Sequence, residues 1–421
     1  MPGIRKSLII GVLLLAVPVI ETVAGEVPAA ECVVGCQPLF DAAIGPEGER
    51  AMIRLPKVER DVKAVLYAHQ NMTEEVLFRS ERFCSKMDTL GVAMAFIQRG
   101  SQNWDPNSDA QARFERIMTE LAEATGHPEI ADAPIIPFGH SAQATFPWNF
   151  AAWNPERTLC IISYHGDAPR TNLCGYGREN VEWGRTRNID RIPGLMIMGE
   201  YEWWDARLLP ALAFRMMYPE SRISFLCDAG KGHFDLCEPT QDYIAKFIEK
   251  SLADPRPEGG VYYSRWMEAG SETADLHEMF WYQDDEMAAL TRSRYQETRG
   301  KRLQHLSACY EGKLIDYKPE SHIKMQLELE GVREFTLEPV FTDEERAALS
   351  ADHADVRPRI VLISGPAIQT GEYSFRYDPD YFGYDPQRLW SGITLTVEAD
   401  GDDEYKPAVQ EINIRIKNAD N

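Results

Sequence analysis

Short apolar runs alternate with longer amphipathic stretches from about Arg50 to Leu252. Six of these runs have the length and composition of buried strands: Lys63–Ala68, Val92–Ile97, Pro134–Phe138, Thr158–Tyr164, Gly194–Met198 and Arg222–Cys227. The stretches between and after them predict helices over Thr73–Met87, Ser108–Thr125, Ala142–Trp153, Ala206–Tyr218 and Pro239–Leu252. Strands that alternate with helices at this spacing predict βαβ units, and therefore an α/β fold with a mostly parallel sheet.

The pattern changes beyond Leu252. Asp254–Gly260 is rich in proline and glycine, which predicts a linker, and a helix is expected over Thr273–Arg299. Four short alternating segments follow: Met325–Leu329, Arg359–Ile363, Thr394–Glu398 and Glu411–Ile416. They predict a small antiparallel, β-rich domain of the sandwich type. We therefore expect an α/β domain over 25–252, a linker and helical segment over 253–300, and a β-rich domain over 301–421.

The first residues have the pattern of a secretory signal peptide. Arg5 and Lys6 precede an apolar run over Leu8–Ile20, and Thr22–Ala24 offers small residues for cleavage. The run is too short to span a bilayer comfortably, so we expect a signal peptide over 1–24, no membrane span, and a secreted or periplasmic protein.

Export would permit disulfides among the eight cysteines. Cys227 and Cys237 flank His233, and a bridge between them would brace the histidine loop. Cys32 with Cys36 and Cys160 with Cys174 are the other local pairings, and the connectivity stays open. The chain has no Cys-x-x-Cys pair and no His-x-x-x-His array, which argues against zinc.

The acidic balance of the chain bears on its partners. Lys and Arg number 44 against 66 Asp and Glu, a net charge of −22. Such a surface repels phosphate backbones and anionic headgroups, so nucleic acid is not an expected partner.

The first candidate for chemistry is a serine between a strand and a helix, in Phe138-Gly139-His140-Ser141-Ala142-Gln143-Ala144. A serine on such a turn projects its hydroxyl above the carboxyl end of the sheet. Gln143 stands where the usual pattern has glycine, although Ala142 and Ala144 keep the turn small. A serine that merely caps the helix is the alternative.

A histidine and a carboxylate follow at later strand ends. His233 lies in the glycine-rich loop Ala229–Phe234, and histidine can take and return a proton near neutral pH. Glu202, three residues past Gly199, can accept the imidazole Nδ1 hydrogen, with Glu200 and Asp205 as rivals. The chain order of Ser141, Glu202 and His233 is the order of a nucleophile–acid–base triad in an α/β-hydrolase.

Two further sets of residues complete the expected site. The backbone N–H groups of Ala142 and Asn71 are the candidate oxyanion donors, with the Asn71 side chain as a possible extra. Trp203 and Trp204 follow the expected acid directly and are candidates for lining a substrate pocket.

The residues GHSAQ, GEYE and GKGHF, with AHQN upstream, resemble the α/β-hydrolase superfamily. Within it the chain is most similar to exported bacterial hydrolases related to dienelactone hydrolases and polyester-depolymerase-like esterases. The resemblance covers about Arg50–Leu252. It implies Ser141 as nucleophile, Glu202 as acid, His233 as base, Asn71 and Ala142 as oxyanion donors, and no metal or organic cofactor. Serine, where dienelactone hydrolases usually have cysteine, favours ordinary esters.

The expected activity is hydrolysis of carboxylic esters through an acyl-enzyme on Ser141, with a small-molecule or saccharide ester as substrate. Export and an added β-rich domain favour an extracellular acylated saccharide. A serine peptidase of the same fold and a non-catalytic binding protein that retains the fold are the alternatives.

Overall fold

The computed structural model describes residues 40–46, 50–58, 61–98, 108–170, 183, 188–200, 202, 204–263, 280–296, 299–302, 304–315, 324–342, 357–378 and 390–417. The expected signal peptide over 1–24 lies outside these residues, as do Cys32, Cys36 and Cys174. Signal, export and localisation therefore stay predictions.

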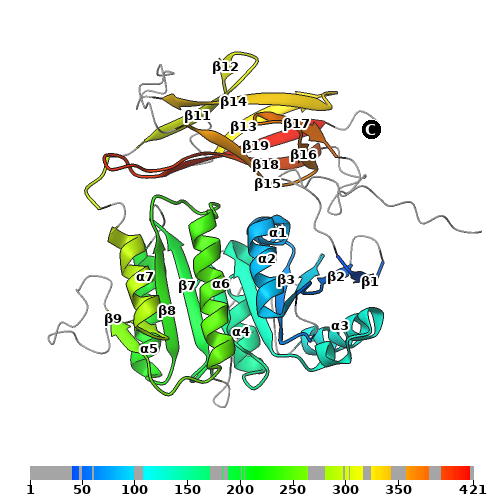
Figure 1. The fold of residues 1–421 in the computed structure, drawn as a ribbon, viewed down its shortest axis with the longest axis vertical. Coiled ribbons are helices and arrows are strands. Elements are labelled where there is room, and N and C mark those ends of the chain that lie inside the picture. Colours follow the sequence, from blue (N-terminus) through cyan, green and yellow to red (C-terminus); the bar gives the residue numbers. More distant parts are fainter. Residues whose placement is uncertain are drawn as a thin grey trace, which may run out of the picture. The chain divides into compact units, whose positions relative to one another are not determined.

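An eight-stranded sheet forms the centre of the first part of the chain (Figure 1). Its strands are β1 (Ala42–Ile44), β2 (Ala51–Arg54), β3 (Ala64–His69), β4 (Val92–Ile97), β5 (Ile135–His140), β6 (Ile161–Tyr164), β7 (Pro193–Gly199) and β8 (Arg222–Asp228). They lie in the order β1-β2-β4-β3-β5-β6-β7-β8, and β3 to β8 are parallel. The first two strands pair antiparallel with each other, and β2 pairs antiparallel with β4.

Helices flank this sheet. They are α1 (Met72–Arg79), α2 (Glu81–Leu90), α3 (Ala110–Thr125), α4 (Phe146–Trp153), α5 (Trp204–Met217) and α6 (Glu238–Ala253), with the 3₁₀ turns η1 (Pro128–Ala131) and η2 (Ser141–Gln143). Alternate residues of β3 enter two separate cores: Leu66 packs with α2 and α6, whereas Val65 and Tyr67 pack with α3 and α4. A sheet buried on both faces explains why its strands read as continuous apolar runs. The strand–helix alternation predicted this mostly parallel sheet, and the resemblance predicted the α/β-hydrolase fold that it forms.

The sequence pattern predicted one helix over Thr73–Met87 where the structure has two. Ser80 has extended backbone angles (φ −69°, ψ 109°) and separates α1 from α2. Its hydroxyl accepts the backbone N–H of Phe83 at 3.2 Å, so Ser80 caps the second helix. Hydrophobic periodicity did not reveal the break, because both helices bury residues against the same core.

The segment expected as a linker with a helix contains more structure than predicted. Strands β9 (Val261–Tyr263) and β10 (Phe280–Tyr282) form an antiparallel pair, and α7 runs over Asp285–Gln296. The hydroxyl of Tyr282 donates to the carbonyl oxygen of Phe225 in β8 at 2.8 Å. This bond attaches the pair to the last strand of the large sheet. The domain boundaries at 252 and 300 stay a prediction.

The C-terminal part is β-rich, as predicted, and its two sheets share one core. One sheet has the order β12-β11-β14-β17-β16 and the other β13-β19-β18-β15. The strands are β11 (His305–Tyr310), β12 (Lys313–Leu314), β13 (Lys324–Glu330), β14 (Glu334–Thr342), β15 (Arg359–Ser364), β16 (Ala367–Gln369), β17 (Ser374–Tyr377), β18 (Trp390–Ala399) and β19 (Ala408–Lys417). The expectation of purely antiparallel pairing was wrong in one place, because β13 pairs parallel with β19.

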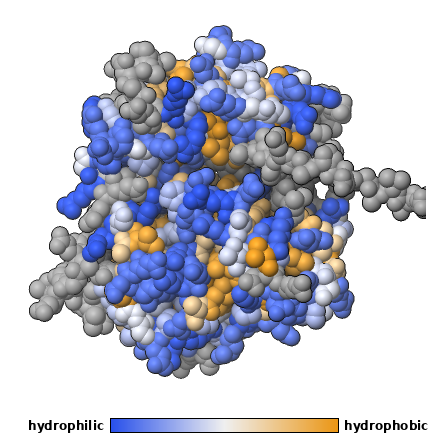
Figure 2. Space-filling model, in the orientation of Figure 1, coloured by the Kyte–Doolittle hydropathy of each residue, from blue (hydrophilic) through white to orange (hydrophobic). Residues whose placement is uncertain are grey.

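The surface is mainly hydrophilic on the face drawn in Figure 2, where apolar residues form scattered patches. Among the described residues, the largest exposed apolar side chains are Val58, Leu209, Met216, Met217 and Leu290. No helix within the described ranges is long and apolar enough to cross a membrane.

Candidate active site

Ser141 occupies a strained turn at the carboxyl end of β5. Its backbone is left-handed (φ 52°), which is unusual for a residue other than glycine. The turn η2 begins at this serine directly after the strand ends at His140, and the side chain is largely buried. Strain at a strand–helix turn presents a hydroxyl above the sheet edge, as the sequence predicted for this segment.

Two close contacts explain how the turn closes with glutamine at position 143. A Cβ atom on Gly139 would lie 2.1 Å from the carbonyl oxygen of Gln143, so only glycine fits there. A Cβ atom on Gly166 would lie 1.8 Å from the Cβ of Ala144. The second close contact of the turn is therefore between Ala144 and Gly166, which lies in the loop after β6. A glycine at 143 is not needed.

The structure brings the three expected triad residues together. The Oγ of Ser141 lies 2.6 Å from Nε2 of His233, and Nδ1 of the same ring lies 2.5 Å from Oε1 of Glu202. A carboxylate accepts hydrogen bonds only, so Nδ1 carries the proton and Nε2 is free to accept the serine hydrogen. The arrangement can therefore move a proton from the hydroxyl to the imidazole.

Glu202, rather than Glu200, is the carboxylate that contacts the histidine. Its Oε2 accepts the backbone N–H of Gly199 at 2.7 Å, and Nη1 of Arg207 lies 3.3 Å from Oε1. Burial opposes its ionisation, but His165, His233 and Arg207 together lower the pKa of Glu202 to about 2. Glu202 is thus an anion at neutral pH.

Glu200 and Asp205 were the other candidates for the acid of the triad. The Oε2 of Glu200 accepts the backbone N–H of Gly230 at 2.8 Å, so this side chain holds the histidine loop without touching the imidazole. The side chain of Asp205 lies outside the described residues.

The expected oxyanion turn lies beside the serine turn. Asn71 is the N-cap residue of α1, and its Nδ2 donates to the carbonyl oxygen of His140 at 2.8 Å. That bond joins the two turns and uses one of the two hydrogens of the Asn71 amide, so the side chain stays a candidate donor to an oxyanion. Ala142 is the second residue of η2. Its backbone N–H lies in the first turn of a helix, where N–H groups have no acceptor within the helix.

A buried carboxyl group supports the serine turn from below. Glu74 is fully buried in α1, and its Oε1 accepts the backbone N–H of His140 at 2.8 Å. Burial raises the pKa of Glu74 to about 8, so this carboxyl is largely protonated at neutral pH. His69, at the end of β3, is also buried, and burial lowers its pKa to about 3. Its neutral ring packs edge-on against Phe146 at 4.5 Å.

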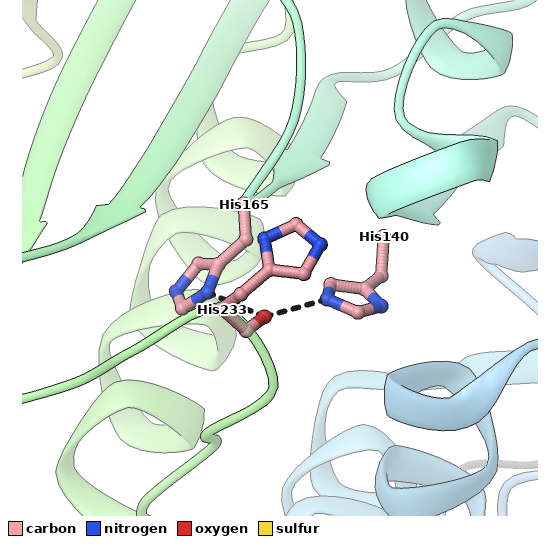
Figure 3. Close-up of side chains that lie close together, drawn as sticks. All are labelled: His140, His165 and His233. Atoms are coloured by element: carbon pink, nitrogen blue, oxygen red, sulfur yellow. Dashed lines mark hydrogen bonds between the residues drawn. The ribbon is translucent and has the colours of Figure 1, made fainter. Parts of the chain in front are cut away.

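Three histidines gather around the carbonyl group of the expected base (Figure 3). Nε2 of His140 and Nδ1 of His165 each lie 2.8 Å from the carbonyl oxygen of His233. Each of the three offers one nitrogen within 4.8 Å of the others, so the group could hold a metal ion by distance alone. Two of the nearest nitrogens, however, already donate to that carbonyl oxygen, which lies between them.

Sequence reasoning missed His165, Arg207 and Glu74. His165 directly follows the predicted strand Thr158–Tyr164, and the carboxyl ends of parallel strands share one edge of a sheet. That position was a usable signal for His165. Arg207 and Glu74 lie inside predicted helices, where no local pattern separates a buried charge from a solvated one.

The expected pocket tryptophans are not placed by the structure. Trp203 lies outside the described residues, and so does the side chain of Trp204. Two other tryptophans that the sequence puts near strand ends have structural partners instead. The indole of Trp148 donates to the carbonyl oxygen of Asp167 at 2.8 Å, and that of Trp183 to Oδ1 of Asn149 at 2.7 Å.

The expected Cys227–Cys237 bridge is not formed. No disulfide joins any two of the described cysteines, which are Cys84, Cys160, Cys227, Cys237 and Cys309. The Sγ of Cys237 lies 3.0 Å from the hydroxyl oxygen of Thr240 at the start of α6, and Cys227 is buried in β8. The histidine loop is braced by hydrogen bonds instead, since Asp235 accepts the backbone N–H of Gly232 at 2.7 Å.

Comparison with known proteins adds structural neighbours only. No protein-family model matches the chain, and no curated protein matches it. It is similar in structure to an alpha-beta serine hydrolase homologue from Coxiella burnetii, at 12% identity over 51% of this chain and 98% of that one, with a TM-score of 0.33. Est1E from Butyrivibrio proteoclasticus matches at 11% identity over 52% and 99%, with a TM-score of 0.33.

A third neighbour is the poly(3-hydroxybutyrate) depolymerase LpqC from Bordetella parapertussis, at 13% identity over 50% of this chain and 85% of that one, with a TM-score of 0.34. These matches cover about half of this chain. The chain's own site is a serine, a histidine and a glutamate that are joined by hydrogen bonds at one edge of an α/β-hydrolase fold.

Proposed function

We propose that the chain is a serine hydrolase that cleaves carboxylic esters through an acyl-enzyme on Ser141. One observation supports this above all others: the continuous hydrogen-bonded series from Ser141 Oγ to His233 to Glu202, at 2.6 and 2.5 Å. A serine that only capped a helix would need neither an imidazole acceptor nor a buried carboxylate behind it.

The reaction follows from this geometry. Oγ of Ser141 attacks the acyl carbon while Nε2 of His233 takes its proton, and Glu202 stabilises the imidazolium that forms. The backbone N–H groups of Ala142 and Asn71 are the proposed donors to the oxyanion. The imidazolium then gives its proton to the departing alcohol oxygen as the ester bond breaks. Water, deprotonated by the same imidazole, hydrolyses the acyl-enzyme and restores the serine.

The class of ester is a further part of the proposal. The expected export and the β-rich C-terminal part favour an acylated saccharide outside the cell. Acetylated oligosaccharides and nitrophenyl acetate are therefore the first substrates to compare, with dipeptide amides as the test of the peptidase alternative.

The experiment measures labelling by a fluorophosphonate together with hydrolysis of nitrophenyl acetate. We expect the wild-type protein to form one adduct, and Ser141→Ala to lose it together with about 10⁴-fold or more of kcat. Ser85→Ala, at an exposed serine on α2, is the matched control and should behave as wild type. Absence of an adduct in the wild type would favour the non-catalytic binding protein, and turnover of dipeptide amides alone would favour the peptidase.

A further inference from the structure

His165 occupies a strained position directly after β6. Its backbone is left-handed (φ 46°), and both its N–H and its carbonyl oxygen form hydrogen bonds. The N–H donates to the carbonyl oxygen of Ile197 at 2.8 Å, and the carbonyl oxygen accepts Nη1 of Arg207 at 3.0 Å. The left-handed conformation is unfavourable for a residue with a side chain, so tertiary contacts hold it there.

One ring nitrogen of His165 faces both members of the acid–base pair. Nδ1 lies 2.8 Å from the carbonyl oxygen of His233 and 3.3 Å from Oε2 of Glu202. Both neighbours are acceptors, so this nitrogen must carry the hydrogen. The ring is fully buried and stacks on Tyr164 at 4.1 Å with an interplanar angle of 9°. Burial lowers the pKa of His165, in keeping with a neutral donor.

His140 completes the contact from the other side, because its Nε2 donates to the same carbonyl oxygen at 2.8 Å (Figure 3). His140 is the residue before Ser141, so the backbone of His233 is tied to the strand that carries the nucleophile. His165 ties it to the next strand and to the acid.

We propose that His165 is a positioning residue for the triad: its Nδ1–H holds the backbone of His233 and the second oxygen of Glu202 in one fixed arrangement. This inference rests on the proposed function. It predicts that loss of the donor lets the imidazole move relative to Ser141 while substrate contacts stay intact. It also predicts that Glu202, with one donor fewer, holds the protonated imidazole more tightly.

The groups that bear on the charge of His165 come from several elements. They are Tyr164 on β6, Glu202 and Arg207 after β7, Asp228 on β8, His233 in the following loop, and His140 on β5.

The test compares His165→Phe, which keeps the stack on Tyr164 but has no donor, with His165→Asn, whose amide can donate from nearly the same place. Misplacement of a reacting group by about 1 Å costs about 10²-fold, so we expect His165→Phe to lower kcat by about that factor with KM unchanged. The acidic limb of its kcat/KM profile should move to higher pH. His165→Asn should restore both properties, and His127→Phe, at a partly exposed histidine paired with Glu129, should change neither.

A measurement on the wild-type protein keeps the inference testable should His165→Phe fail to fold. Nitrogen-15 NMR of labelled histidines should show His165 neutral with its hydrogen on Nδ1. A hydrogen on Nε2, or an imidazolium at neutral pH, would overturn the proposal. Zinc is the second probe: tight binding of zinc to the wild type that His165→Asn abolishes would make His165 a metal ligand instead.

Failure of the inference and failure of the proposed function give different results. A wild type with a Ser141-dependent adduct, and a folded His165→Phe variant with unchanged kcat and pH profile, would contradict the positioning role alone. A wild type without adduct or turnover contradicts the proposed function, whatever the tautomer of His165.

Discussion

Glu74 gives a prediction whose size can be worked from the structure. Its carboxyl is fully buried beneath the serine turn, Oε1 accepts the N–H of His140, and Oε2 has no hydrogen-bond partner among the described residues. Burial raises its pKa from 4.5 to about 8. The folded state therefore keeps a proton that the unfolded chain releases between these two pH values.

The free energy of unfolding must decrease as the pH rises through this window. The slope reaches about 1.4 kcal/mol per pH unit, because one pKa unit corresponds to that free energy. Between 4.5 and about 8 the total is about 5 kcal/mol. Below pH 4.5 the folded state has the full stabilising contribution of Glu74 to the free energy of unfolding. Above pH 8 this contribution does not decrease further.

Glu74→Gln should remove this pH dependence. Glutamine keeps the acceptor for the N–H of His140 and cannot ionise. The unfolding free energy of the variant should therefore rise steadily relative to that of the wild type from pH 4.5 to 8. The measurement is urea unfolding at a series of pH values, followed by tryptophan fluorescence, since every tryptophan of the nine except Trp390 precedes the β-rich part.

Glu81→Gln is the matched control, because it removes an exposed carboxylate from the neighbouring helix α2. Its unfolding free energy should follow the wild-type pH profile. The reasoning is refuted if Glu74→Gln and the wild type give parallel profiles between pH 4.5 and 8, because Glu74 would then titrate alike in the folded and unfolded chains.

Three further variants test the site and its scaffold. Glu202→Gln should lower kcat for nitrophenyl acetate by about 10⁴-fold, because the amide does not stabilise the imidazolium. Gly139→Ala should lower the unfolding free energy by about 1–3 kcal/mol and abolish fluorophosphonate labelling, since its Cβ would meet the carbonyl oxygen of Gln143 at 2.1 Å. Arg54→Ala should cost about 3–5 kcal/mol in urea unfolding, because it leaves the buried Asp88 without its two bonds of 2.6 and 2.7 Å.

Each of these variants has a control on the same chain. Glu200→Gln keeps an acceptor for Gly230 and should retain kcat, so an equal loss in both glutamine variants would contradict the choice of Glu202. Gly259→Ala meets no atom within 4 Å and should label normally. Arg82→Ala removes an exposed pair with Asp242 and should lower the unfolding free energy far less than Arg54→Ala does; an equal loss in the two variants would contradict the role of burial.

Part of the site could be predicted because each of its residues follows a strand. Ser141, Glu202 and His233 lie after apolar runs of strand length, and parallel strands bring their carboxyl ends to one edge. The choice between Glu202 and Glu200 was less secure. Both follow β7 within three residues, and only the path of the loop decides which carboxylate meets the imidazole.

Other features depend on contacts between distant segments. Gln143 looked like a departure from a glycine-requiring turn, and Gly166, 23 positions further on, supplies the missing space. The parallel pairing of β13 with β19 joins segments over 80 residues apart, which alternation of apolar residues does not encode. Likewise, cysteine spacing suggested a bridge that Cys227 and Cys237 do not form with each other.

The sequence by itself determined the alternation of strands and helices, and with it the parallel sheet and the edge at which its polar side chains gather. The sequence could determine these features because apolar residues that face the core recur every two residues in a strand and every 3.6 residues in a helix. Tertiary structure alone decided which carboxylate ionises, which stays protonated, and which histidine donates to which oxygen. Those properties depend on burial and on partners within about 3 Å, and such partners come from strands that the chain order separates.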